Sequence, residues 1–123
     1  MSDDCLFCRI AAGEIPSQRV FEDEEIVAFR DIAPQAPVHV LVIPKGPYVN
    51  FDHFANEASA EEIADFTRTA GQICRAMNIA PGDGDAGYRT ISNAGDHGVQ
   101  EVPHYHLHIL GGRVLGRMLK RAD

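Results

Sequence analysis

The sequence lacks any apolar run approaching the roughly 18 residues of a membrane span, and its N-terminus has no basic start followed by an apolar core. Cysteine is scarce, with three residues at positions 5, 8 and 74. An odd number does not suit a disulfide framework, and a reducing compartment would keep the side chains as thiols. We therefore expect a cytoplasmic protein with no membrane association.

Positive charge is also scarce, since 11 Lys and Arg face 18 Asp and Glu, a net charge of −7. Such a chain repels a long polyanion on average, so we expect no nucleic acid polymer as a partner. A small anion is not excluded, because backbone N–H groups can hold a phosphate. With 123 residues, 45% of them hydrophobic, and no internal repeat, the chain is predicted to form one domain over 1–123, ending in a tail from about 114.

The hydrophobic pattern predicts two helices and five strands. Apolar residues recur every three or four positions from Ser59 to about residue 78, and Ser59 with Glu62 fits a capping box. The order of elements has too few crossovers for a doubly wound parallel sheet, so we predict an α+β domain with a mainly antiparallel sheet. The other expected elements are a short helix over 5–12 and strands over 19–22, 26–29, 38–43, 88–92 and 102–110.

Three histidines, His104, His106 and His108, alternate with Tyr105 and Leu107 in the last predicted strand. Alternate residues of a strand share one face, at intervals of roughly 6.5–7 Å. The histidine face is open to three interpretations: a solvated polar surface, a metal site or a catalytic site. Spacing alone does not separate metal binding from catalysis.

The residues upstream of the histidines favour phosphate over a metal. Asn93 offers a neutral amide donor, and the turn Gly98-Val99-Gln100-Glu101 offers backbone N–H groups beside the strand. The neighbourhood therefore indicates catalysis on a phosphate-containing substrate.

The run His104-Tyr105-His106-Leu107-His108-Ile109-Leu110 resembles the histidine triad motif. Segments 29–39, 42–45 and 111–113 also resemble the histidine triad nucleotide-binding branch of that superfamily, and the similarity extends from about residue 5 to residue 119. The resemblance implies a HIT-like fold with a five-stranded mainly antiparallel sheet, one long helix and one short helix. It also implies a homodimer in which two sheets join into a continuous ten-stranded sheet.

The same resemblance implies a hydrolase that cleaves purine nucleoside 5′-phosphoramidates and acyl- or aminoacyl-adenylates and releases the nucleoside monophosphate. His106 would be the nucleophile and form a nucleotidyl-histidine, with His108 assisting at the phosphate and His104 supporting His106. No cofactor is expected to be required for catalysis. The alternatives are a dinucleoside polyphosphate hydrolase and a nucleotide- or zinc-binding regulatory module without turnover.

The resemblance further implies a site for a purine nucleotide such as AMP or GMP. Asp31 would hold the ribose hydroxyls, and a carboxylate suits them because it accepts hydrogen bonds from both. Without the resemblance, the apolar residues of this set would be assigned to the core, and Asp31 could equally be a loop cap. The remaining implied contacts are Phe7, Ile10, Phe29 and Ile32 at the base, His39 nearby, and Asn93, Gln100, His108 and the backbone of Val99 and Glu101 at the phosphate.

Two departures from the family pattern bear on the site. Glu101 stands where many relatives have a serine, and Pro103, which cannot donate a strand hydrogen bond, indicates an edge or a bulge. Cys5 and Cys8 have the spacing of half a structural zinc site, which His104 would extend. Pro47 stands where a further ligand is expected, and His53 or His97 would have to substitute for it. A structural zinc therefore remains open against a pair of reduced thiols.

Overall fold

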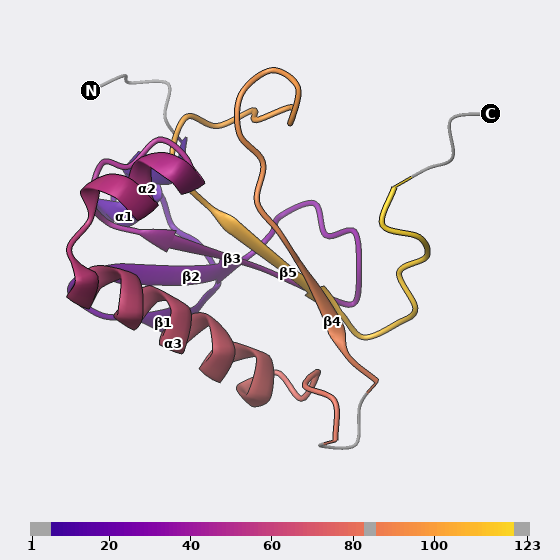
Figure 1. The fold of residues 1–123 in the computed structure, drawn as a ribbon. Helices are drawn as coiled ribbons and strands as arrows, with labels where there is room; N and C mark the ends of the chain where they lie inside the picture. Colours follow the sequence, from indigo (N-terminus) through magenta and orange to yellow (C-terminus); the bar gives the residue numbers. More distant parts are fainter. Residues whose placement is uncertain (1–5, 83–85, 120–123) are drawn as a thin grey trace.

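The structure, a computed structural model, describes residues 6–82 and 86–119. Its centre is a five-stranded sheet in the order β1-β2-β3-β5-β4, in which every neighbouring pair is antiparallel (Figure 1). The predicted α+β class and antiparallel sheet are therefore confirmed. The strands are β1 (Arg19–Glu22), β2 (Ile26–Arg30), β3 (Val38–Pro44), β4 (Tyr88–Ile91) and β5 (Leu107–Gly111).

The helices are α1 (Leu6–Ala11), α2 (Phe51–Glu57) and α3 (Ala60–Ala76). The capping box at the start of α3 is confirmed, because the side chains of Ser59 and Glu62 each accept from the other residue's backbone N–H. The prediction of a single short helix was wrong, since α2 is a second one. Its seven residues are too few to show a helical period, although Asn50 caps it by accepting from the N–H of His53.

The strand predicted over 102–110 begins only at Leu107. Residues 102–104 form a bend around Pro103, which has no N–H to give to a ladder. The N–H of Tyr105 instead donates to the carbonyl of Tyr48 at 2.7 Å. Two of the three histidines, His104 and His106, therefore lie in an ordered segment before the strand, and only His108 is in β5.

The sheet is covered on both faces. One face packs against α3, where Val40, Val42 and Ile109 meet Phe66 and Ile73, and Figure 1 shows α3 lying across this face. The other face packs against α1 through a second cluster, which contains Phe7, Ile10, Val27, Phe29, Leu41 and Ile43. This double burial explains the nearly continuous apolar run of β3.

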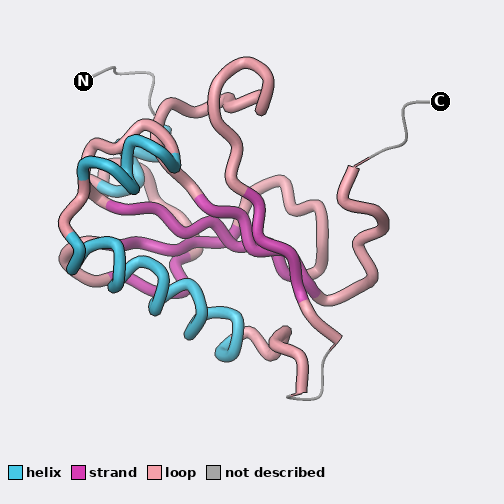
Figure 2. The backbone as a smooth tube through the Cα atoms, viewed as in Figure 1, coloured by secondary structure: helices cyan, strands magenta, loops and turns pink. Residues whose placement is uncertain are grey.

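The connection between β4 and β5, residues 92–106, is the long loop that projects beyond one end of the sheet (Figure 2). It carries the predicted phosphate turn and ends at the first two histidines of the triad. Within the described residues, no helix combines the length and apolar character needed to cross a membrane.

Candidate active site

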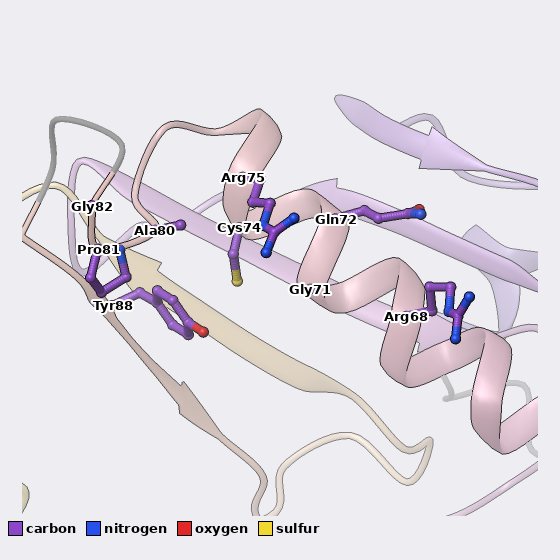
Figure 3. Close-up of a pocket in the computed structure, with 9 residues that line it drawn as sticks. All are labelled: Arg68, Gly71, Gln72, Cys74, Arg75, Ala80, Pro81, Gly82 and Tyr88. Carbon is purple, nitrogen blue, oxygen red and sulfur yellow. The ribbon is translucent and has the colours of Figure 1, made fainter.

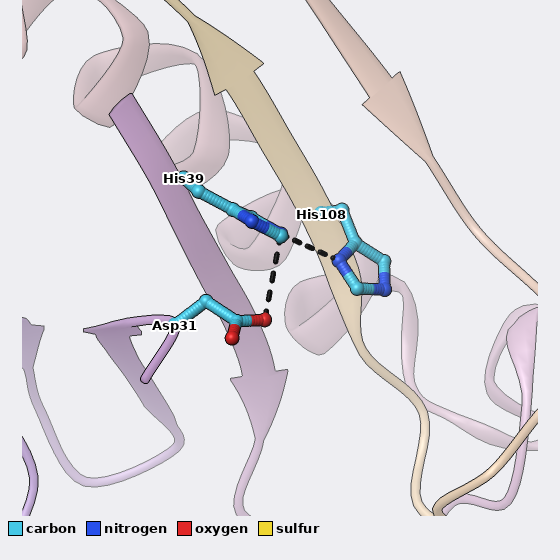
Figure 4. Close-up of side chains that lie close together, drawn as sticks. All are labelled: Asp31, His39 and His108. Atoms are coloured by element: carbon cyan, nitrogen blue, oxygen red, sulfur yellow. Dashed lines mark hydrogen bonds and ion pairs between the residues drawn. The ribbon is translucent and has the colours of Figure 1, made fainter. Parts of the chain in front are cut away.

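The strand register brings His39 and His108 together. His39 pairs with Leu110 and His108 pairs with Leu41, so the two histidines are diagonal neighbours on one face of β3 and β5. Asp31, just after β2, reaches the same point (Figure 4). The His106 ring lies beside His108, with 5.0 Å between ring centroids. Three histidines and one carboxylate thus gather on the α1 side of the sheet.

An aromatic cluster on the opposite side holds the segment that carries His104 and His106. Tyr105, which lies between them, is 4% exposed and stacks on Phe54 of α2 at 5.2 Å. Its ring also lies 5.2 Å from Phe66 of α3. Because Tyr105 points into the α3 face, the two histidines point to the other face. The helix that the sequence did not reveal therefore supports the site directly.

One hydrogen bond defines the tautomer of His106. Its Nδ1 lies 2.7 Å from the main-chain carbonyl oxygen of His104. A carbonyl oxygen only accepts, so Nδ1 carries a proton. In a neutral ring the lone pair is then on Nε2, the atom that a nucleophilic histidine needs. Phe7 meets the ring edge-on at 4.6 Å, which fixes its plane.

The expected support of His106 by His104 comes from this backbone carbonyl and not from the His104 ring. The ring turns away, and its Nε2 donates to the carbonyl of Pro44 at the end of β3, at 2.6 Å. The His104 side chain, 2% exposed, therefore ties the catalytic segment to the sheet.

His39 and His108 also have defined tautomers. The N–H of Gln35 donates to His39 Nδ1 at 3.1 Å, so the proton of a neutral His39 is on Nε2. That Nε2 lies 2.9 Å from His108 Nδ1 and 3.5 Å from Asp31 Oδ2. His108 Nδ1 must then accept, which leaves an N–H at His108 Nε2. The pair thus presents a hydrogen-bond donor at His108 Nε2, an atom with no partner among the described residues.

Burial keeps these rings neutral. Desolvation lowers the pKa of His39, His104 and His106, with nearby Asp31 partly opposing the effect at His39 and His106. The pKa of His108 falls to about 4, because of burial and then the neighbouring His106 and His39. All four are therefore uncharged near neutral pH, as the tautomers above require.

Two cavities flank the Asp31–His39 pair. One, of about 770 Å³, is lined by His39, His108, Asn93 and Gln35 among others, so it joins the predicted phosphate residues Asn93 and His108. The second, of about 640 Å³, is lined by Asp31, Ile32, Arg30, Gln18 and Ser17 among others. Sequence reasoning missed the last three, which are exposed or partly exposed polar residues with no motif.

A third cavity, of about 830 Å³, lies between the C-terminal half of α3 and strand β4 (Figure 3). Arg68, Gln72, Arg75 and Tyr88 are among its lining residues. It contains none of the predicted site residues. We therefore place the chemistry at the histidines, where oriented donors and lone pairs converge, and not in this larger space.

In the predicted phosphate turn, some of the hydrogen-bond donors already bond to other groups of the protein. Val99 has a φ of 55°, and its N–H donates to the carbonyl of Asp96 within the turn, at 3.1 Å. The Gln100 side chain donates to the carbonyls of Val49 and Val102. In this arrangement Gln100 and the Val99 N–H hold the loop, while Glu101 is exposed next to it.

The residues expected at the base divide into two groups. Phe7, Ile10 and Phe29 are 6%, 5% and 3% exposed and belong to the core under α1, whereas Ile32 is 91% exposed. Asp31 shows the loop-cap geometry as well, because its Oδ1 accepts from the N–H of Ala33 at 2.8 Å. Its carboxylate retains lone pairs for a further donor.

Of the three residues expected to bind zinc, Cys8 and His104 lie close together. Cys8 Sγ lies 3.1 Å from the unprotonated Nδ1 of His104, while Cys5 lies outside the described residues. Contrary to the expected reduced thiol, Cys8 is disulfide-bonded, so it would have to be reduced to bind zinc as a thiolate. The substitute ligand His53 is engaged elsewhere, since its Nδ1 accepts from the N–H of Val49.

Asp31, His39 and His108 also place potential ligand atoms within 4.8 Å of one another. This set does not suit a metal in the observed arrangement. The N–H of Gln35 occupies His39 Nδ1, so the proton sits on Nε2, where a metal would need the lone pair. The cluster is better described as a hydrogen-bond network.

A family model of the HIT domain matches residues 12–115. The chain belongs to the HIT domain family. Over 123 aligned residues this HIT domain is 46% identical to a protein named purine nucleoside phosphoramidase from Escherichia coli strain K12, and the alignment covers 97% of this chain and 96% of that protein.

Solved structures agree with the HIT fold. A HIT family hydrolase from Clostridium thermocellum superposes with a TM-score of 0.84 at 39% identity, covering 97% of this chain and 100% of that one. A HIT family hydrolase from Legionella pneumophila Philadelphia 1 gives a TM-score of 0.80 at 45% identity, covering 92% and 96%. The histidine triad resemblance seen in the sequence is confirmed.

We predict that acid destabilises this HIT domain. A histidine with a lowered pKa in the folded state takes up its proton first in the unfolded chain, so stability is complete above about pH 6.5 and falls as the pH approaches 4. Urea unfolding at pH 7 and pH 5 should give a smaller free energy of unfolding at pH 5. His108→Gln should reduce the difference, whereas His97→Gln, on the exposed loop, should retain it. An unchanged difference in His108→Gln would contradict the prediction.

Proposed function

We propose that this HIT domain cleaves purine nucleoside 5′-phosphoramidates and acyl-adenylates through a nucleotidyl intermediate on His106. The observation that carries the proposal is the bond from His106 Nδ1 to the His104 carbonyl, which leaves a lone pair on Nε2 of a buried, neutral ring. The E. coli relative named purine nucleoside phosphoramidase supports the substrate class.

In the first step, His106 Nε2 attacks the α-phosphorus, the new N–P bond forms, and the bond from phosphorus to the leaving nitrogen or acyl oxygen breaks. The His106 ring becomes cationic, and the His104 carbonyl stabilises it through Nδ1–H. His108 Nε2–H donates to a phosphoryl oxygen as negative charge accumulates there. A leaving amine takes up a proton from water.

In the second step, water attacks the same phosphorus and the bond to His106 breaks, which releases the nucleoside monophosphate and restores the neutral ring. The proton that water loses balances the one taken up by the amine. The nucleotide would lie with its phosphate near Asn93 and His108 and its ribose on Asp31. The base would then reach the cavity lined by Arg30 and Ile32.

Turnover of adenosine 5′-phosphoramidate tests the nucleophile. His106→Ala should lose essentially all activity, because no other lone pair replaces Nε2, whereas His97→Ala should retain the wild-type rate. Both are measured with EDTA at equal folded concentration, and radiolabelled substrate should label the wild type only. Turnover by His106→Ala would contradict the proposal. Faster turnover of a diadenosine polyphosphate would favour that hydrolase class, and tight AMP binding without turnover would favour a regulatory module.

A 2′-deoxy substrate tests Asp31. Removing one hydroxyl leaves part of the carboxylate unpaired, which costs about 1–3 kcal/mol, or roughly fivefold to a hundredfold in kcat/KM. The ribo and deoxy phosphoramidates are compared in wild type and in Asp31→Asn, where the difference should shrink. Equal kcat/KM for both substrates in the wild type would remove Asp31 from the ribose site.

We also propose that two copies join through β4. This strand is an edge of the sheet, and Tyr88 on it is 45% exposed beside the cavity under α3. An edge strand presents unpaired N–H and C=O groups, which a second β4 would satisfy in a ten-stranded sheet. Light scattering should therefore give twice the chain mass of 13.5 kDa. A mass of one chain across micromolar concentrations would contradict the dimer.

A further inference from the structure

Arg113 follows β5 and reaches back to the loop between β2 and β3. Its Nη2 donates to the carbonyl of Gln35 at 2.7 Å, and its Nη1 donates to the carbonyl of Val114 at 2.8 Å. The two bonds use different nitrogens of one planar guanidinium, so the group bridges the tail and the loop in a fixed orientation. None of the expected roles in catalysis or nucleotide binding accounts for this residue.

The loop that Arg113 holds is the one that orients His39. Gln35 accepts from Arg113 through its C=O, and its own N–H donates to His39 Nδ1. Gly112 adds a second contact, because a Cβ there would lie 2.9 Å from Pro37 Cβ. The turn after β5 therefore contacts the loop at Gln35 and at Pro37, and a shift of the turn would move the Gln35 N–H.

A continuous hydrogen-bonded series then runs from Arg113 to the site. The Gln35 N–H meets His39 Nδ1, His39 Nε2 meets His108 Nδ1 at 2.9 Å, and His108 presents Nε2–H. If the Gln35 N–H moved away, His39 could carry its proton on Nδ1. Its Nε2 would then accept from His108 Nδ1, and His108 Nε2 would present a lone pair toward an anionic phosphate. Asp31, 3.5 Å from His39 Nε2, opposes this reversal but does not contact Nδ1.

We propose that Arg113 is a positioning residue, which holds the Gln35 carbonyl and thereby keeps His39 in the tautomer that leaves His108 with a proton on Nε2. It touches no reacting atom. Its effect on turnover rests on the proposed function, while its effect on the tautomer does not.

The tautomer is measured directly by the ¹⁵N chemical shifts of the histidine rings in the free protein. The wild type should show His108 protonated on Nε2. Arg113→Met, which keeps the length of the side chain but removes its donors, should show a mixture of the two tautomers. Arg117→Met removes a positive charge from the same tail and should leave the His108 signal unchanged. An Nε2–H signal of wild-type intensity in Arg113→Met would overturn the inference.

Kinetics provides the second readout. Arg113→Met should lower kcat by roughly tenfold to a hundredfold, as expected for a misplaced catalytic group, with KM within about twofold. Arg113→Lys, which can still donate to the Gln35 carbonyl, should recover most of kcat and shows whether loss of folding explains the first variant. In a His39→Gln background, Arg113→Met should have no further effect.

Equal losses from Arg113→Met in both backgrounds would show that Arg113 acts independently of His39 and would overturn the inference. Failure of the proposed function has a different signature, because the wild type would then turn over no phosphoramidate while the tautomer shift in Arg113→Met would remain.

Discussion

The carbonyl oxygen of His104 accepts a hydrogen bond from Nδ1–H of His106, and the proposed chemistry of the site depends on this contact. A peptide carbonyl cannot rotate independently or titrate, so the orientation of the His106 ring, the proposed nucleophile, depends on the backbone. That backbone is held by Tyr105, whose ring is stacked in an aromatic cluster and whose N–H is bonded to Tyr48. The core on one face of the sheet thus holds the His106 ring in place on the other.

The proposed site would hold an anionic phosphate with neutral groups. The chain has a net charge of −7, and the histidines are uncharged because burial lowers each pKa. Their desolvation is offset by hydrogen bonds, and within the described part of the chain no buried side-chain nitrogen or oxygen lacks a partner. Oriented N–H dipoles in a dry environment stabilise developing charge without a reorganisation cost at the moment of reaction. In the proposed function, recognition of phosphate would come from the direction of these N–H groups and not from net charge.

Much of the fold could be predicted from the sequence, because β3 and α3 carry strong apolar patterns and Ser59 and Glu62 have the spacing of a capping box. The family motif pointed to His106. The positions of His104 and His106 outside β5 could not be predicted, since alternation looks the same in an extended segment whose N–H groups bond elsewhere. Helix α2 was too short to have a period. The role of Gln35 lies in its backbone, which no side-chain pattern reveals.

The site is assembled from distant parts of the chain. His39 and His108 are 69 positions apart, and Gln35 and Arg113 are 78 apart. Such pairings close long loops, so the chain loses conformational entropy before the contacts between the paired residues can offset that loss. The helices and the β2–β3 hairpin need only local sequence, so they can form while the chain is still growing on the ribosome. The proposed proton arrangement of His39 and His108 cannot form until Arg113 has emerged, so it is one of the last features that folding completes.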